Sequence, residues 1–134
     1  MSDVELKNMA FESGMELKVT GVTTPCCSRF SINVGHSREN IALHFNPRFH
    51  YGGDQEVTVM NSCKDGCWQE EMKEKFFPFR LRMEFEVTII FADDKFYINQ
   101  HNGHVVQFPN RPGDKEYDYI WIEGDVTVKR IHVN

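Results

Sequence analysis

The feature that most constrains this chain is an alternation of apolar and polar residues that recurs along nearly its whole length. It is clear in residues 30–35, 41–46 and 85–91. Alternate side chains of a β-strand point to opposite faces of a sheet, so a period of two predicts half-buried strands. Turn signals separate these runs, and Asn102-Gly103 is the strongest hairpin dipeptide among them. About ten or eleven short strands with tight turns predict an all-β antiparallel sandwich or barrel.

Length and charge narrow the choice of function. A chain of 134 residues is expected to form a single domain over residues 1–134. Lys and Arg number 15 against 20 Asp and Glu, a net charge of −5, which argues against a nucleic-acid partner. No apolar run approaches the roughly 18 residues of a membrane span, so membrane insertion is not expected. The polar, acidic start of the chain carries no secretory signal, which favours synthesis in the cytoplasm.

The four cysteines do not form a recognisable metal or disulfide framework. Cys26 and Cys27 are adjacent, and Cys63 and Cys67 are separated by three residues. The Cys-x3-Cys spacing is longer than the usual zinc knuckle, and no second pair lies nearby in the sequence. We therefore expect free thiols in a reducing compartment and no bound metal.

The segment Leu43-His44-Phe45-Asn46-Pro47-Arg48-Phe49 carries the first chemical signal. On a strand, His44, Asn46 and Arg48 share one face while the two phenylalanines point inward. An imidazole, an amide and a guanidinium side by side offer different donors and acceptors, which is typical of a surface that reads hydroxyl groups. Taken alone, the same pattern also fits a solvated strand face.

Two further segments favour the recognition hypothesis. Asn61 ends another predicted strand, and Trp68 precedes Glu71 by three residues. An indole can stack on the C–H face of a sugar ring, whereas a carboxylate accepts hydroxyl protons or holds a guanidinium in a bidentate pair. We expect Glu71 to pair with Arg48, with Asp54 as a second anchor for the same arginine.

Together these segments resemble the galectins over nearly the whole chain, from about Gly14 to Val133. Residues 29–35 and 96–98 look especially like the fish galectins called congerins. The segments that carry the family resemblance are His44-Phe45-Asn46-Pro47-Arg48-Phe49, Val59-x-Asn61-Ser62, Trp68-x-x-Glu71, Phe77-Pro78-Phe79, Phe108-Pro109-Asn110-Arg111 and Glu123-Gly124-Asp125.

The resemblance implies a two-sheet jelly-roll sandwich, galectin-like or legume-lectin-like, that binds β-galactosides such as lactose without a metal, a cofactor or catalysis. It implies that the galactose 4-hydroxyl is bound by three side chains of one strand and the 6-hydroxyl by Asn61 and Glu71. Trp68 would stack on galactose, and Asp54 and Val59 would support the site. The three residues assigned to the 4-hydroxyl are His44, Asn46 and Arg48, of which Arg48 would also reach the second sugar.

Two positions depart from the family's commonest pattern. Lys73 stands where galectins usually have an arginine, so a point charge replaces a planar fork among the carbohydrate-binding residues. Gly52 stands where many single-domain members carry a histidine beside the second sugar. His50 and Tyr51 are the candidates to compensate on this loop. We expect these changes to affect the preference for the second sugar more than that for galactose.

The alternatives are a glycoside hydrolase, a metal site and an intracellular lipid-binding β-barrel. A glycosidase needs two carboxylates about 5–9 Å apart, but Glu70 and Glu71 would point to opposite faces of a strand. His101 and His104 flank a predicted turn, where histidines are usually solvated. A lipid-binding barrel needs a helical lid after its first strand, whereas residues 15–35 alternate as strands do.

Apolar residues alternate at both ends of the chain and could complete the core. The galectin resemblance implies instead that terminal strands pair across a two-fold axis, which gives a homodimer that agglutinates or cross-links glycoconjugates in defence or recognition. It also implies unconventional secretion to the extracellular space or mucus. The residues assigned to the dimer interface are Val4, Leu6, Ile131 and Val133.

Overall fold

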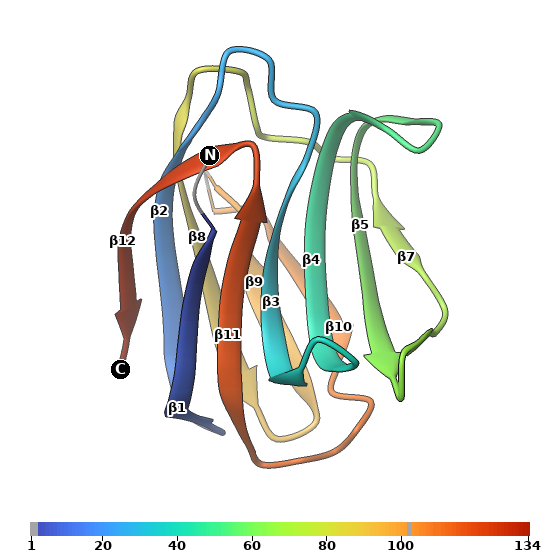
Figure 1. Ribbon diagram of the computed structural model, residues 1–134, viewed down its shortest axis with the longest axis vertical. Helices are drawn as coiled ribbons and strands as arrows, with labels where there is room; N and C mark the ends of the chain where they lie inside the picture. Colours follow the sequence, from blue (N-terminus) through green and yellow to red (C-terminus); the bar gives the residue numbers. More distant parts are fainter. Residues whose placement is uncertain (1–2, 102) are drawn as a thin grey trace.

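The computed structural model describes residues 3–101 and 103–134, and all regular elements among them are strands. Figure 1 shows two sheets packed face to face. The strands are β1 (Val4–Glu12), β2 (Glu16–Thr23), β3 (Phe30–Ser37), β4 (Asn40–Tyr51), β5 (Asp54–Lys64), β6 (Cys67–Trp68), β7 (Met72–Glu74), β8 (Glu84–Ala92), β9 (Lys95–Asn99), β10 (Val105–Pro109), β11 (Glu116–Gly124) and β12 (Val126–Val133).

The two sheets are antiparallel throughout. The first has the order β1-β11-β3-β4-β5-β6, with β7 also paired to β5, and the second has the order β10-β9-β8-β2-β12. The expectation of an all-β two-sheet sandwich is therefore confirmed, and the barrel alternative is wrong. The structure has more strands than predicted because β6 and β7 are too short to leave an alternating pattern.

Aromatic side chains fill the space between the sheets. Phe30 of the first sheet stacks on Phe85 of the second with 4.8 Å between ring centroids, and Phe79 packs edge-on against both. Most phenylalanines are buried there, as the inward alternation predicts, whereas Phe76 is exposed. This burial of apolar area is the main stabilising contribution to a sandwich of this kind.

The sequence also accounts for a close backbone contact at Gly124 and for the pairing of β9 with β10. Gly124 has a φ of 111°, and a Cβ there would lie 2.5 Å from the Cα of Phe30, so only glycine fits between β11 and β12. Strands β9 and β10 pair with Asn99 opposite Val105. The Asn102 half of the predicted hairpin turn lies outside the described residues.

The remaining sequence expectations concern cysteines and the membrane. All four cysteines are free, with Cys27 and Cys63 buried and Cys26 and Cys67 exposed. Burial raises the pKa of the Cys27 thiol to about 12, with a smaller contribution from the nearby charge of Asp125. Among the described residues, no helix has the length and apolar character to cross a membrane.

Candidate carbohydrate-binding site

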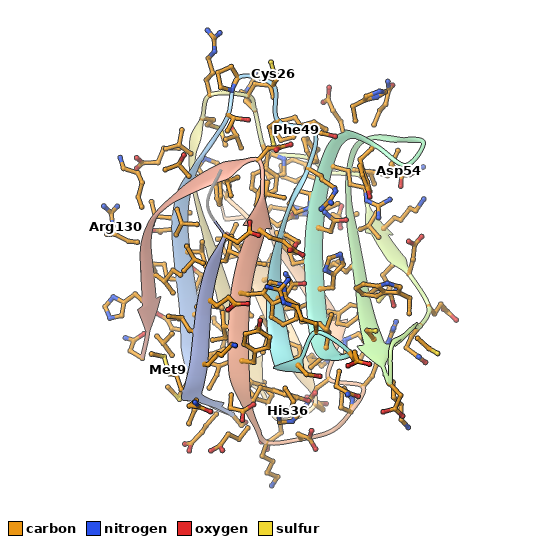
Figure 2. All side chains as sticks on the ribbon, viewed as in Figure 1. Met9, Cys26, His36, Phe49, Asp54 and Arg130 are labelled. Carbon is orange, nitrogen blue, oxygen red and sulfur yellow. The ribbon has the colours of Figure 1, made fainter. Side chains whose placement is uncertain are left out.

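The outer face of the first sheet carries a hollow of about 520 Å³ over β4, β5 and β6. This is the face turned toward the viewer in Figure 2, where Asp54 marks its upper end. The residues that line the hollow are Arg29, His44, Asn46, Arg48, Tyr51, Val59, Asn61, Trp68, Gln69, Glu71 and Glu123.

Strand register explains why these side chains meet. His44 lies opposite Asn61, and Asn46 lies opposite Val59, in the antiparallel pair of β4 and β5. Trp68 joins this face because β6 pairs with the end of β5, which places Trp68 opposite Cys63. The predicted face of alternate polar residues on β4 is therefore present, and it is continuous with Asn61 and Trp68.

The imidazole of His44 has a defined tautomer. Its Nδ1 lies 2.5 Å from the side-chain oxygen of Asn33 on β3. The Nδ2 of Asn33 donates to the Oγ of Ser31 and the carbonyl oxygen of Trp121, which fixes the amide with its oxygen toward the imidazole. An amide oxygen can only accept, so Nδ1 carries the proton and Nε2 is left as an acceptor.

Burial keeps this imidazole neutral. Desolvation, and after it the positive charge of Arg48, lower the pKa of His44 to about 4, against a smaller opposing effect of a hydrogen bond with Asn46. At neutral pH the site therefore presents an unprotonated ring nitrogen that can accept a hydroxyl proton.

The protein fills part of the hydrogen-bonding capacity of Asn46 and Arg48 and fixes how the rest is presented. The Nδ2 of Asn46 donates to the carbonyl oxygen of Phe30 over 2.7 Å, and its Oδ1 accepts from the Nε of Arg48 over 2.9 Å. The Nη1 of Arg48 donates to Asp54 over 2.8 Å. The amide retains one free N–H and one lone pair, and the guanidinium retains its Nη2 donors for a ligand.

The expected Arg48–Glu71 pair is wrong. Among the described residues, the carboxylate within ion-pair distance of Arg48 is that of Asp54, and Lys73 binds the other oxygen of Asp54 at 2.9 Å. Asp54 begins β5 in the same hairpin as Arg48, whereas Glu71 lies between β6 and β7. Hydrogen bonds with Lys73 and Arg48 hold the pKa of Asp54 below its usual range, against the effect of desolvation.

The argument that Glu70 and Glu71 sit on opposite faces of one strand is also wrong, because neither belongs to a strand. Both side chains are exposed, and Glu71 lines the hollow. Trp68 is 53% exposed, and its ring lies 4.8 Å from that of His44. The indole is therefore open to a ligand, whereas Trp121 is 2% exposed and structural.

The loop beside Gly52 brings Tyr51, rather than His50, into the hollow. The Tyr51 ring lies 5.1 Å from the Arg48 guanidinium and 4.4 Å from that of Arg29. His50 is exposed and turns toward the amide of Gln55. Gly52 has a φ of 58°, which favours glycine in this turn.

Several residues of the site were not predicted: Arg29, Gln69 and Glu123 line the hollow, and Asn33 does not line it but bonds to His44. Asn33 has a sequence signal, because Ser31 and Asn33 are polar residues alternating in an apolar strand. Both are buried, which in a strand calls for hydrogen-bond partners. Gln69 and Glu123 lie in or near segments quoted above, but no pattern points them at the site.

The predicted interface residues lie away from this hollow, on β1 and β12. Leu6, Ile131 and Val133 are partly buried and pack against the core, and Val4 is half-buried.

Of the histidines considered for a metal site, His104 packs against Phe76 with 4.1 Å between ring centroids and lies 3.8 Å from Glu74. The described residues contain no group of three or more His, Cys, Asp or Glu side chains able to hold a metal ion.

Comparison with known proteins agrees with this geometry. Residues 3–133 match the family described as galactoside-binding lectin. A galactose-binding lectin of Anguilla japonica is 46% identical over 134 residues, which is all of this chain and 94% of that protein.

Two solved structures have the same fold. Congerin II, with lactose and MES bound, matches with a TM-score of 0.95 at 41% identity. The match covers 99% of this chain and 100% of the congerin II chain. A homodimeric agglutinin of chicken liver, CG-16, has a TM-score of 0.95 at 33% identity, with the same coverage. The chain belongs to the galactoside-binding lectins, the galectin family.

Proposed function

We propose that this protein is a β-galactoside-binding lectin that binds lactose-type glycans without catalysis. The observation that carries the proposal is the pairing of an exposed indole, Trp68, with a row of polar groups whose protein-side hydrogen bonds are already made. The lactose-bound relative congerin II supports the choice of ligand.

The geometry suits galactose in particular. The axial 4-hydroxyl of galactose leaves C–H groups on one face of the ring, and this face can lie on Trp68. The hydroxyl then meets His44, Asn46 and Arg48, the β4 row. The Nε2 of His44 would accept the 4-hydroxyl proton, and Asn46 and Arg48 would donate to its oxygen. An equatorial epimer would leave these half-buried groups unpaired, and sites built in this way discriminate strongly.

In the same proposal, Asn61 and Glu71 bind the 6-hydroxyl, Arg48 extends to the second sugar, and Tyr51 borders that sugar. Lys73, Asp54 and Val59 support the site: Asp54 holds Arg48, Lys73 holds the other oxygen of Asp54, and Val59 forms the floor of the hollow. His50 has no direct contact with galactose. Preference for the second sugar therefore depends on the Tyr51 loop.

Retention on immobilised lactose tests the ligand. The protein is expected to bind and to elute with free lactose but not with cellobiose, which has the equatorial 4-hydroxyl. Trp68→Ala and Arg48→Ala are expected to pass through unretained, whereas Arg80→Ala, at an exposed position, behaves as the parent. A folded parent protein that is not retained would contradict the proposal.

We further propose that the chain forms a homodimer through β1 and β12 and cross-links glycans. These strands are the terminal strands of the two sheets, and Figure 1 shows both on the same side of the sandwich. Pairing across a two-fold axis would extend both sheets and hold two sugar sites apart. The homodimeric chicken agglutinin supports this assembly.

Light scattering at micromolar concentration is expected to give twice the chain mass of 15.7 kDa. A species with the mass of one chain, with lactose binding intact, would contradict the dimer and leave the ligand proposal standing. Red-cell agglutination should then be absent, since one site cannot bridge two cells.

The proposal includes action outside the cell after synthesis in the cytoplasm. The free cysteines support synthesis in a reducing compartment. The test is the appearance of the protein in the medium of cells whose vesicular secretion is blocked. Its disappearance from the medium under that block would contradict unconventional export.

A further inference from the structure

Arg111 contacts residues of the site although it belongs to a separate loop. It lies in the loop between β10 of the second sheet and β11 of the first. Its Nη1 lies 2.9 Å from the Oγ of Ser62 and 3.3 Å from the Oδ1 of Asn61. Its Nη2 donates to the carbonyl oxygen of Glu70 over 2.8 Å. One guanidinium thus ties the end of β5 to the segment that carries Glu71.

The guanidinium is itself held in place. It stacks on the ring of Phe108 at 4.7 Å. The neighbouring Asn110 is buried, and its Nδ2 donates to the carbonyl oxygens of Asp93 and Asp114. Tyr117 donates its hydroxyl proton to the Oδ1 of Asn110. The loop therefore presents Arg111 in a fixed position, and a planar fork loses less entropy on bonding than a flexible ammonium.

The contacts of Asn61 determine what it can offer a ligand. Its Oδ1 accepts from the backbone N–H of Ser62 at 2.7 Å and from Arg111, which uses both lone pairs. Its Nδ2 donates one proton to the carbonyl oxygen of Gln69. The amide is therefore locked with its oxygen inward, and the remaining capacity is a single N–H.

The segment between β6 and β7 depends on the same residue. Gln69 N donates to the carbonyl oxygen of Ser62, but Glu70 and Glu71 are exposed and belong to no strand. The bond from Arg111 to the carbonyl oxygen of Glu70 fixes the backbone immediately before Glu71. Both groups assigned to the sugar 6-hydroxyl therefore adjoin bonds made by Arg111.

We infer that Arg111 is a positioning residue that sets how the site reads the 6-hydroxyl of galactose, by fixing the Asn61 amide as a donor and holding Glu71 in register. This inference rests on the proposed galactoside-binding function. Without Arg111 the amide would lose one of the three bonds that orient it, and the segment 69–71 would lose its bond to the loop between β10 and β11.

The experiment compares three ligands, lactose, 6′-deoxylactose and 4′-deoxylactose, by calorimetry. The parent is expected to bind lactose at least about tenfold more tightly than either deoxy analogue, a ratio equivalent to roughly one good hydrogen bond. In Arg111→Lys, which keeps the charge but not the fork, the ratio against 6′-deoxylactose should fall below about threefold. The ratio against 4′-deoxylactose should be unchanged, because the hydrogen bonds that Arg111 makes among the described residues go to Asn61, Ser62 and Glu70 and not to His44, Asn46 or Arg48.

Arg80→Lys is the matched control, because it makes the same exchange at an exposed position. Ser62→Ala, which removes one acceptor of the guanidinium, should lower the 6′-deoxy ratio by a smaller factor and serves if Arg111→Lys does not fold. An unchanged 6′-deoxy ratio in the folded variants would overturn the inference, as would an equal fall in both ratios, which marks a general loss of structure.

A readout without sugar separates this inference from the proposed function. The Nδ2 proton of Asn61 that donates to the carbonyl oxygen of Gln69 is expected to exchange slowly with solvent, as measured by NMR, in the parent and faster in Arg111→Lys. If the parent binds no lactose but this change occurs, the function proposal fails while the positioning of Asn61 stands. Equally slow exchange in the variant would overturn the positioning itself.

Discussion

The Nδ1 of His44 on β4 lies 2.5 Å from the side-chain oxygen of Asn33 on β3, so a buried amide decides which nitrogen of the imidazole carries the proton. The amide cannot turn over, because its NH2 already donates to Ser31 and to the backbone of Trp121. The acceptor that faces the ligand is thus set by a residue that does not line the hollow.

Replacing Asn33 by Ala should therefore weaken lactose binding through the His44 tautomer. We expect a loss of roughly three- to thirtyfold in affinity by calorimetry, equivalent to about one hydrogen bond to the correct tautomer. Ser31→Ala is the control, since it removes a partner of the amide nitrogen but leaves its oxygen beside His44. Equal losses in the two variants would show that packing, rather than the tautomer, is responsible.

The pH dependence of binding follows from the depressed pKa of His44. Because that pKa is about 4, lactose affinity should be flat from pH 5 to 8 and fall as the pH approaches 4. The unfolded chain binds this proton near its ordinary pKa, so the same group lowers the free energy of unfolding as pH falls from about 6.5 to 4. A titration of affinity with a midpoint near 6.5 would contradict a buried, neutral imidazole.

Asp54 should matter more than Lys73, although the two are bonded to each other. Asp54 anchors Arg48, and Asp54→Ala leaves a half-buried guanidinium unpaired, so we expect a loss of about tenfold or more in lactose affinity. Lys73 is 47% exposed, so Lys73→Ala should cost less than about threefold. Surface plasmon resonance on the two variants measures the difference, and a reversed order would show that the ammonium contacts the sugar.

The two tryptophans can be separated by fluorescence. In Trp121→Phe the remaining indole, Trp68, is half-exposed, so its emission should shift to shorter wavelength when lactose covers it. In Trp68→Phe the remaining indole is buried at β11, and its emission should not respond. A response in the second variant would place a sugar contact at Trp121.

His36 provides a stability prediction outside the site. Burial lowers its pKa, but hydrogen bonds to Asp114 and Asp118 outweigh that effect and raise it overall. A raised pKa stabilises the fold at low pH, and this contribution is lost as pH rises through the folded-state value. His36→Gln should therefore lower Tm by about 1–3 °C at pH 6 and by less at pH 9. Calorimetric scans of the parent and the variant at pH 6 and pH 9 measure the difference in Tm. A difference that is larger at pH 9 than at pH 6 would contradict this role of His36.

The regular parts of the site could be predicted from the sequence. His44, Asn46 and Arg48 share a face because β4 is a regular strand over these positions, and strand periodicity needs no knowledge of the partner. Trp68 lies beside them because of the short hairpin of β5 and β6. Nothing in the local pattern predicts this hairpin, and the sequence placed Trp68 at the site only through the family resemblance.

The irregular parts could not be predicted in this way. Whether Arg48 pairs with Asp54 or Glu71 depends on the path of the segment 69–71, which carries no periodic signal. Arg111 lies 50 residues from Asn61 in sequence, and only the packing of the two sheets brings them together. Long-range contacts of single side chains leave no trace in local patterns.

The sugar hollow and β1, one strand of the proposed dimer interface, lie toward opposite ends of the first sheet. The sugar hollow lies over β4, β5 and β6, and β1 stands at the far end of the strand order, beyond β11 and β3. Apart from Arg38, which bonds both Glu5 of β1 and Glu123 of the hollow, substitutions in the two regions should combine additively. Evolution or an engineer can therefore change the glycan preference of this lectin and the strength of its proposed dimer one at a time, without compensating changes at the other end.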